Sequence, residues 1–166
     1  MRIRQASTAG DEILVRHYRA IWQSYGVAES NIEPDADRIV ADFIKDGRRN
    51  FRMAAFLAEI NGEVVGSSAC QLHRVPYPAA AVPAFRRYGY IWHVFVEPHA
   101  RRQGVAAELV HSALSHLQSI GCTTAVLHTS EAGRSLYEKL GFETATEMRL
   151  DLAEWQAGKA ERRPAD

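Results

Sequence analysis

Apolar residues recur at helical spacing in four stretches of the chain. These stretches are residues 11–25, about Pro34 to Asp46, Val105–Ile120 and Glu131–Leu140. Side chains three or four residues apart share one face of a helix, so each stretch predicts an amphipathic helix. A glycine follows each of the last three stretches, where it favours the end of a helix: Gly47, Gly121 and Gly141.

Shorter apolar or alternating segments predict strands. They are Arg2–Ala6, Met53–Glu59, Glu63–His73, Tyr90–Val96, Thr123–Thr129 and Phe142–Leu152. Asn61-Gly62 separates the second segment from the third, and such a pair between two strands indicates a tight hairpin. The loop of residues 74–88 contains Pro76, Pro78 and Pro83. It is too long for a simple connector, so it is either a binding loop or an irregular surface excursion.

The predicted order of elements is β-α-α-β-β-β-α-β-α-β. Strands joined by a crossover helix pair in parallel, whereas the Asn-Gly hairpin pairs antiparallel. We therefore expect an α/β fold with a mixed sheet and helices on both faces. Residues 1–152 form one domain in this interpretation, and residues 153–166 form a polar C-terminal tail.

Composition excludes several classes of protein. Lys and Arg together number 20, as do Asp and Glu, which argues against a dedicated nucleic-acid binder. No apolar run reaches the roughly 20 residues that span a membrane. Cys70 and Cys122 form no CxxC pair, so we expect free thiols and a cytoplasmic protein. The seven histidines show no ligand spacing such as HExxH, so no metal site is expected.

The turn from Val96 into the helix that begins at Val105 has the properties of an anion site. The first N–H groups of a helix have no partner within it, and the peptide dipoles leave about half a positive charge there. Gly104 lets the backbone approach a ligand closely. Arg101 and Arg102 add charge that could face phosphate. A phosphorylated ligand is therefore expected here.

Two motifs in this region and beyond it resemble the GNAT superfamily of acyl-CoA-dependent N-acetyltransferases. Arg101-x-x-Gly104-x-Ala106 is similar to the family signature Gln/Arg-x-x-Gly-x-Gly/Ala, and it follows Val94-Phe95-Val96-Glu97-Pro98, which is similar to V-x-V-x-P. The segment from Gly133 to Phe142 resembles the family's Tyr-bearing helix and the strand after it. The element order also agrees from Arg2 to Leu152.

The resemblance implies a sheet that splays between the strand ending at Val96 and the one ending near Thr129, with acetyl-CoA as cosubstrate in the gap. The pantetheine arm would bond backbone groups of Val94, Phe95 and Val96. The diphosphate would lie on the amides of the following turn and helix: Arg101, Arg102, Gln103, Gly104, Val105, Ala106 and Ala107. Ser130 and Gly133 complete the expected cofactor contacts. Family members often carry Asn at the position of Ser130, which is shorter.

Acetyl transfer from a thioester to an amine needs a neutral amine and a proton for the leaving thiolate. Neutralising an amine of pKa about 10.4 at pH 7 costs roughly 4–5 kcal/mol. A tyrosine is still protonated at pH 7 and can donate to sulfur, and the resemblance gives this role to Tyr137. Gly133, four residues earlier, would leave room on the same helix face. Core packing is the alternative role for Tyr137.

The base is sought on the strand that ends at Val96. His93 has a suitable intrinsic pKa, but strict alternation turns it away from Tyr90, Trp92 and Val94 unless the strand carries a bulge. A hydrogen-bonded structural role is the alternative. Glu97, beyond the strand, is either a second candidate or a solvated carboxylate.

Aromatic side chains of the first helix, the long loop and this strand are expected to line the acceptor pocket: Trp22, Tyr25, Tyr77, Tyr90 and Trp92. Core packing or loop anchoring is the alternative for each. The leading hypothesis is acetylation of a primary amine on a small molecule. A protein or peptide N-terminal acetyltransferase and a non-catalytic acyl-CoA sensor are the alternatives. Many relatives pair as dimers, so the resemblance also implies a homodimer.

Overall fold

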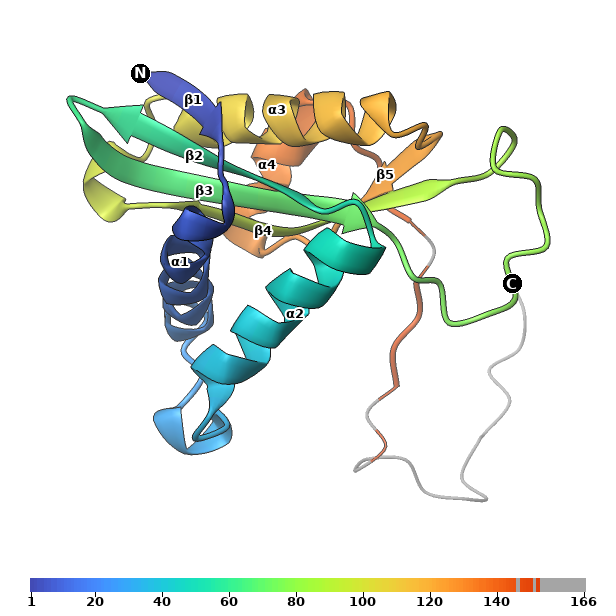
Figure 1. Ribbon diagram of the computed structural model, residues 1–166. Helices are drawn as coiled ribbons and strands as arrows, with labels where there is room; N and C mark the ends of the chain where they lie inside the picture. The colour runs from blue at the N-terminus through green and yellow to red at the C-terminus, as the bar shows by residue number, and fades with distance from the viewer. Residues whose placement is uncertain (146, 151, 153–166) are drawn as a thin grey trace, which may run out of the picture.

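The computed structural model of the protein describes residues 1–145, 147–150 and 152 (Figure 1). Its centre is a five-stranded sheet in the order β1-β2-β3-β4-β5. The strands are β1 (Arg2–Gln5), β2 (Ala54–Ile60), β3 (Glu63–Leu72), β4 (Tyr88–Val96) and β5 (Thr124–Val126). The pairs from β1 to β4 are antiparallel, and β5 lies parallel to β4. The expected mixed sheet is confirmed.

Helices cover both faces of this sheet. The long helices are α1 (Asp11–Ser24), α2 (Ala36–Asn50), α3 (Val105–Ser119) and α4 (Glu131–Lys139), and three short 3-10 turns are η1 (Thr8–Gly10), η2 (Glu29–Asn31) and η3 (Pro98–Ala100). Figure 1 shows α1 and α2 on one side of the sheet and α3 on the other. Tyr137 and Leu140 of α4 pack against the same core as α3.

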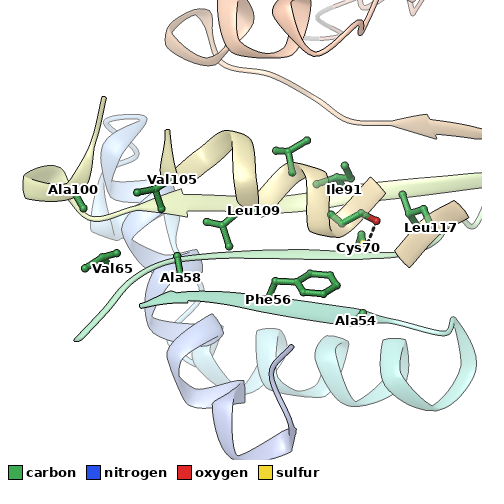
Figure 2. Close-up of a cluster of buried hydrophobic side chains, with 12 residues drawn as sticks. Ala54, Phe56, Ala58, Val65, Cys70, Ile91, Ala100, Val105, Leu109 and Leu117 are labelled. Carbon is green, nitrogen blue, oxygen red and sulfur yellow. Dashed lines mark hydrogen bonds between the residues drawn. The ribbon is translucent and has the colours of Figure 1, made fainter. Parts of the chain in front are cut away.

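Two apolar cores result, one on each face of the sheet. Figure 2 shows the core under α3, where Phe56 and Ile91 of the sheet meet Leu109 and Leu117. Leu14 of α1 and Ile44 of α2 belong to the other core, with Leu57 of β2. Because β2 is covered on both faces, it is apolar at successive positions rather than at alternate ones.

The hairpin between β2 and β3 turns as predicted from Asn61-Gly62. Both residues have positive φ, 52° for Asn61 and 84° for Gly62. A two-residue loop with this backbone matches the twist of the flanking strands, and Asn and Gly adopt it at little cost.

Two expectations were wrong, one about the end of a helix and one about the last strand. Gly47 does not end α2, which continues to Asn50. A Cβ at Gly47 would lie 2.5 Å from Oε1 of Gln71 and 2.9 Å from Sδ of Met53. This glycine therefore allows α2 to pack closely on the sheet, and it gives no information about the end of the helix.

The predicted strand Phe142–Leu152 is the second error. No strand is assigned to the described residues of this segment, 142–145, 147–150 and 152. Its alternating apolar side chains predicted one buried face, yet Met148 is 95% exposed and Leu150 is 65% exposed. Without an element to cover that face, alternation alone does not form a strand. The expected C-terminal tail, residues 153–166, lies outside the described residues.

Candidate functional site

The sheet opens between β4 and β5, as the resemblance implied. The two strands pair at three positions, Tyr88 with Thr124, Gly89 with Ala125, and Tyr90 with Val126. Beyond Tyr90, β4 continues to Val96 with β3 as its partner on one side. The edge of β4 that faces away from β3 is therefore open from Ile91 to Val96, over about 17 Å at a strand rise of about 3.4 Å per residue.

The turn that follows β4 leaves a group of backbone donors without acceptors. Gly104 is the N-cap of α3, has φ of 81° and makes no side-chain cap bond. None of the N–H groups from Gly104 to Ala107 donates to a residue that the structure describes. A Cβ at Gly104 would meet nothing within 4 Å. This is the arrangement of a helix N-terminus that can hold a diphosphate.

The side chains of Arg101, which was predicted to face phosphate, and of Gln103 instead hold this turn in place. Nε of Arg101 donates to the carbonyl oxygen of Val96 at 3.0 Å, and Nε2 of Gln103 donates to that of His99 at 3.1 Å. Arg102 is exposed and has φ of 63°, a region that few non-glycine residues occupy. The two positive φ values, at Arg102 and Gly104, turn the chain sharply into α3.

Tyr137 of α4 is half-buried and packs against the core under α3. A Cβ at Gly133 would lie 3.1 Å from Cε2 of Tyr137, so the glycine makes room for the ring. Burial, and to a smaller extent the nearby phenol of Tyr25, raises the pKa of Tyr137 to about 12. The hydroxyl is thus protonated at neutral pH. Ser130, an expected cofactor contact, is the N-cap of α4, and its Oγ accepts from the N–H of Gly133 at 3.3 Å.

His93 lies in the core and not at the open edge. It is 1% exposed, and burial followed by the nearby His17 lowers its pKa to about 3. Its Nε2 lies 2.6 Å from Oγ of Ser67, which lies 2.7 Å from Nδ1 of His17. Nε2 of His17 lies 3.5 Å from Oε1 of Glu97. His93 therefore has no direct contact with solvent, and the two candidate bases His93 and Glu97 are joined through His17 and Ser67.

A bulge explains how His93 reaches the α1 face. Ala69 of β3 pairs with His93 and Cys70 pairs with Ile91, which leaves Trp92 as an extra residue in β4. The bulge places Trp92 and His93 on the same face, where the rings of both lie near Tyr18 of α1, at 5.6 and 6.2 Å between centroids. Strict alternation therefore fails at this position.

The structure brings three of the five predicted acceptor residues into one aromatic group. Trp22 contacts Tyr25 and Tyr18, and Tyr18 contacts Trp92. Tyr18 and Trp22 also line a cavity of about 250 Å³ between α1 and α2, whose apolar wall includes Ile32, Ile39 and Val40. An acceptor with an apolar body would fit this surface.

Tyr77 and Tyr90 have other partners. Tyr77 lies in the long loop, which projects outward beyond the end of the sheet (Figure 1), and it accepts a hydrogen bond of 3.1 Å from Nη2 of Arg86. The Tyr90 hydroxyl lies 2.5 Å from Nδ1 of His128. Nε2 of His128 lies 2.9 Å from Oε2 of Glu147.

Sequence reasoning missed four polar residues near the site: His17, Ser67, His128 and Glu147. They lie in different elements and follow no spacing motif. Of these four residues, only Ser67 has a signal in the sequence, because it is a polar residue within a buried strand. That signal for a functional residue is weak.

Comparison with known proteins now assigns the family. The model of the acetyltransferase (GNAT) family matches residues 13–142. The chain belongs to the GNAT family of acetyltransferases and is a transferase of the N-acetyltransferase type. The chain is similar over most of its length to the uncharacterized N-acetyltransferase YhfO of Bacillus subtilis (strain 168). The two are 29% identical over 149 residues, which is 88% of this chain and 92% of the relative.

The chain is also similar to a second curated acetyltransferase and to a solved acetyltransferase structure. Glucosamine 6-phosphate N-acetyltransferase of Trypanosoma brucei brucei is 32% identical over 102 residues, covering 58% of this chain and 63% of the relative. A crystal structure of a predicted acetyltransferase with acetyl-CoA from Clostridium acetobutylicum superposes with a TM-score of 0.76 at 22% identity. It covers 93% of this chain and 97% of that one, which confirms the fold.

The described residues contain neither a cluster of metal ligands nor a membrane-spanning helix. No three or more His, Cys, Asp and Glu side chains gather there in a way that could hold a metal ion. No helix in the described ranges has the length and apolar character needed to cross a membrane.

Proposed function

We propose that the protein transfers an acetyl group from acetyl-CoA to the primary amine of a small molecule. The observation that carries the proposal is the continuous path from the open edge of β4 to the free amides of Gly104–Ala107. Backbone groups on that edge can bond an extended amide-containing arm. The amides at the start of α3 can hold its diphosphate.

The residues present fit such a cosubstrate. The region around Gly104 has no side chain that a diphosphate would displace. When bound, the cosubstrate supplies a thioester carbonyl that an amine can attack. Arg101 keeps the end of β4 and the start of α3 together through the carbonyl of Val96. The arm and the diphosphate sites therefore keep a fixed spacing.

Tyr137 is the proton donor in this proposal. As the amine nitrogen bonds to the carbonyl carbon, the C–S bond breaks and its electron pair goes to sulfur. The hydroxyl of Tyr137, whose pKa burial raises to about 12, then gives its proton to the thiolate. The proton lost from the attacking nitrogen returns to the tyrosine through solvent.

The aromatic group on α1 supports a small acceptor. Trp22 and Tyr25 are 40% and 56% exposed, and the cavity that Trp22 lines with Tyr18 holds about 250 Å³. A cavity of that volume suits a small molecule with an apolar body and one amine. It is too small to take up part of a folded protein.

Thiol release from acetyl-CoA, measured with small amines, amino acids and peptides in parallel, tests the proposal. We expect turnover with small amines of apolar body. Turnover with peptides alone would favour a peptide N-terminal acetyltransferase. Binding of acetyl-CoA without turnover on any acceptor would favour an acyl-CoA sensor.

A further inference from the structure

The hydrogen bond between Tyr90 and His128 joins β4 to the chain after β5 at the point where the two strands separate. Tyr90 is the last residue of β4 that pairs with β5, opposite Val126. His128 follows that partner by two residues. Their side chains meet with 2.5 Å between the tyrosine oxygen and Nδ1 of the histidine. The pair therefore closes the inner end of the gap.

The direction of this hydrogen bond follows from Glu147. Hydrogen bonds from His128 and then from Arg149 lower the pKa of Glu147, so its carboxylate is ionised at neutral pH and can only accept. The contact of 2.9 Å between Oε2 of Glu147 and Nε2 of His128 therefore requires a proton on Nε2. Nδ1 of the neutral imidazole is then the acceptor, and the hydroxyl of Tyr90 donates to it.

We propose that Tyr90, His128 and Glu147 form a proton relay that deprotonates the acceptor amine. This proposal rests on the proposed function, because the relay lies where a thioester along β4 would end. The Tyr90 oxygen takes a proton from the ammonium group of the acceptor as its own proton passes to Nδ1 of His128. Glu147 stabilises the imidazolium that forms, and His128 later releases the proton to water. Tyr90 is the residue that touches the amine, and the other two act through it.

The surroundings of the relay fit this role. His73 stacks on the ring of Tyr90 with 5.1 Å between centroids, and burial followed by His128 lowers the pKa of His73, so it is neutral beside the relay. Burial, followed by the nearby Tyr18, raises the pKa of Tyr90. The side chain of His128 is 55% exposed, so it can return its proton to solvent directly.

The relay lies near the aromatic acceptor group, and Tyr90 is its residue on β4. Tyr18 belongs to that group through Trp22 and Trp92, and Trp92 follows Tyr90 by two residues on β4, which places the two side chains on one face of the strand. An amine held by its apolar body on α1 would therefore have its nitrogen near Tyr90. The buried His93 has no comparable access, because it is 1% exposed.

The test is the pH dependence of turnover in Tyr90→Phe, His128→Asn and Glu147→Gln. His111→Asn is the matched control, since His111 is also exposed and lies 3.9 Å from a glutamate, Glu108, on α3. At about pH 7 we expect Tyr90→Phe and His128→Asn to lower kcat/KM by about 10² or more. The deficit should shrink toward about pH 10, where the acceptor amine loses its proton to solvent. The control should keep the unmodified profile.

A weakly basic acceptor separates proton transfer from a structural role. An arylamine is neutral at pH 7 and needs no base, so all the relay variants should acetylate it nearly as fast as the unmodified protein. A deficit that is equal at every pH and for every acceptor would overturn the relay, as would an effect below about twofold. If the unmodified protein acetylates no amine, the proposed function itself fails, and that result is distinct from both.

Discussion

The ring of Tyr137 occupies the space that Gly133 leaves on α4, with 3.1 Å between Cε2 of the tyrosine and the position of a Cβ at the glycine. Such a contact holds the phenol in one orientation. The same burial raises the pKa of Tyr137 to about 12, so the group can give a proton and seldom loses it beforehand. Position and protonation state both suit a donor to a leaving thiolate.

Replacing Tyr137 by phenylalanine should therefore lower kcat by at least about tenfold, since proton donation contributes about 10² to 10⁴. The affinity for acetyl-CoA should be nearly unchanged, because the ring and its packing remain. Steady-state kinetics with calorimetric titration of acetyl-CoA measures both. A kcat equal to that of the unmodified protein would remove Tyr137 from the chemistry.

Ala106→Asp tests the diphosphate site without weakening the helix. A carboxylate in the first turn of α3 is favourable for the helix dipole, yet it repels a diphosphate on the amides of Gly104–Ala107. We expect the Kd for coenzyme A to rise by about tenfold or more, and the melting temperature to be kept. Ser115→Asp, which adds the same charge at an exposed position farther along α3, should leave the Kd unchanged. Equal affinities for both variants would exclude this site.

The hydroxyl of Ser67 is bonded by two buried imidazoles, 2.7 Å from Nδ1 of His17 and 2.6 Å from Nε2 of His93. Ser67→Ala leaves both nitrogens without that partner, and each unsatisfied buried group costs about 1–3 kcal/mol. Denaturant unfolding should report a loss in the free energy of unfolding of at least about 2 kcal/mol. Ser115→Ala, at an exposed site on α3, should change it by less than about 0.5 kcal/mol. A loss as small as the control's would mean that the three groups do not form a buried network.

The same histidines predict how stability depends on pH. Burial, with Arg16 for His17 and His17 for His93, lowers their pKa values to about 4 and about 3. Unfolded histidines bind protons near pH 6.5. Between these values the unfolded state binds more protons, so stability is fully present above about pH 6.5 and falls as the pH drops.

Each histidine contributes a slope of up to about 1.4 kcal/mol per pH unit in this range. Chemical denaturation between about pH 6.5 and 5 measures it, and His17→Gln should have a shallower slope than His111→Asn. A free energy of unfolding that is constant over this interval would contradict the burial of neutral imidazoles.

The helices and strands whose buried side chains recur at a regular spacing could be predicted from the sequence. Gly104, Gly121 and Gly141 mark helix ends because each needs a positive φ, and all three adopt one. Gly47 could not be distinguished from them, because its role is close contact with Met53 and with Gln71 of β3, which the local sequence does not show. The sequence shows a glycine whether it ends a helix or allows close packing, and only the tertiary structure distinguishes the two roles.

The free amides at the start of α3 were accessible to sequence reasoning, and the contacts of the proposed base were not. Free amides at Gly104 follow from a local turn and a helix start, which are properties of a short segment. The relay of Tyr90, His128 and Glu147 depends on where β4 and β5 separate, which no short motif records. The bulge at Trp92 likewise arises from a mismatch with β3, so the face of His93 could not be read from alternation.

The most direct test of the account is an amide-resolved NMR titration of the labelled protein with acetyl-CoA. We predict the largest chemical-shift changes at Gly104–Ala107 and along β4 from Ile91 to Val96, with little change in α2. Changes confined to another surface, or no changes at saturating acetyl-CoA, would contradict the claim that the thioester lies along the open edge of β4.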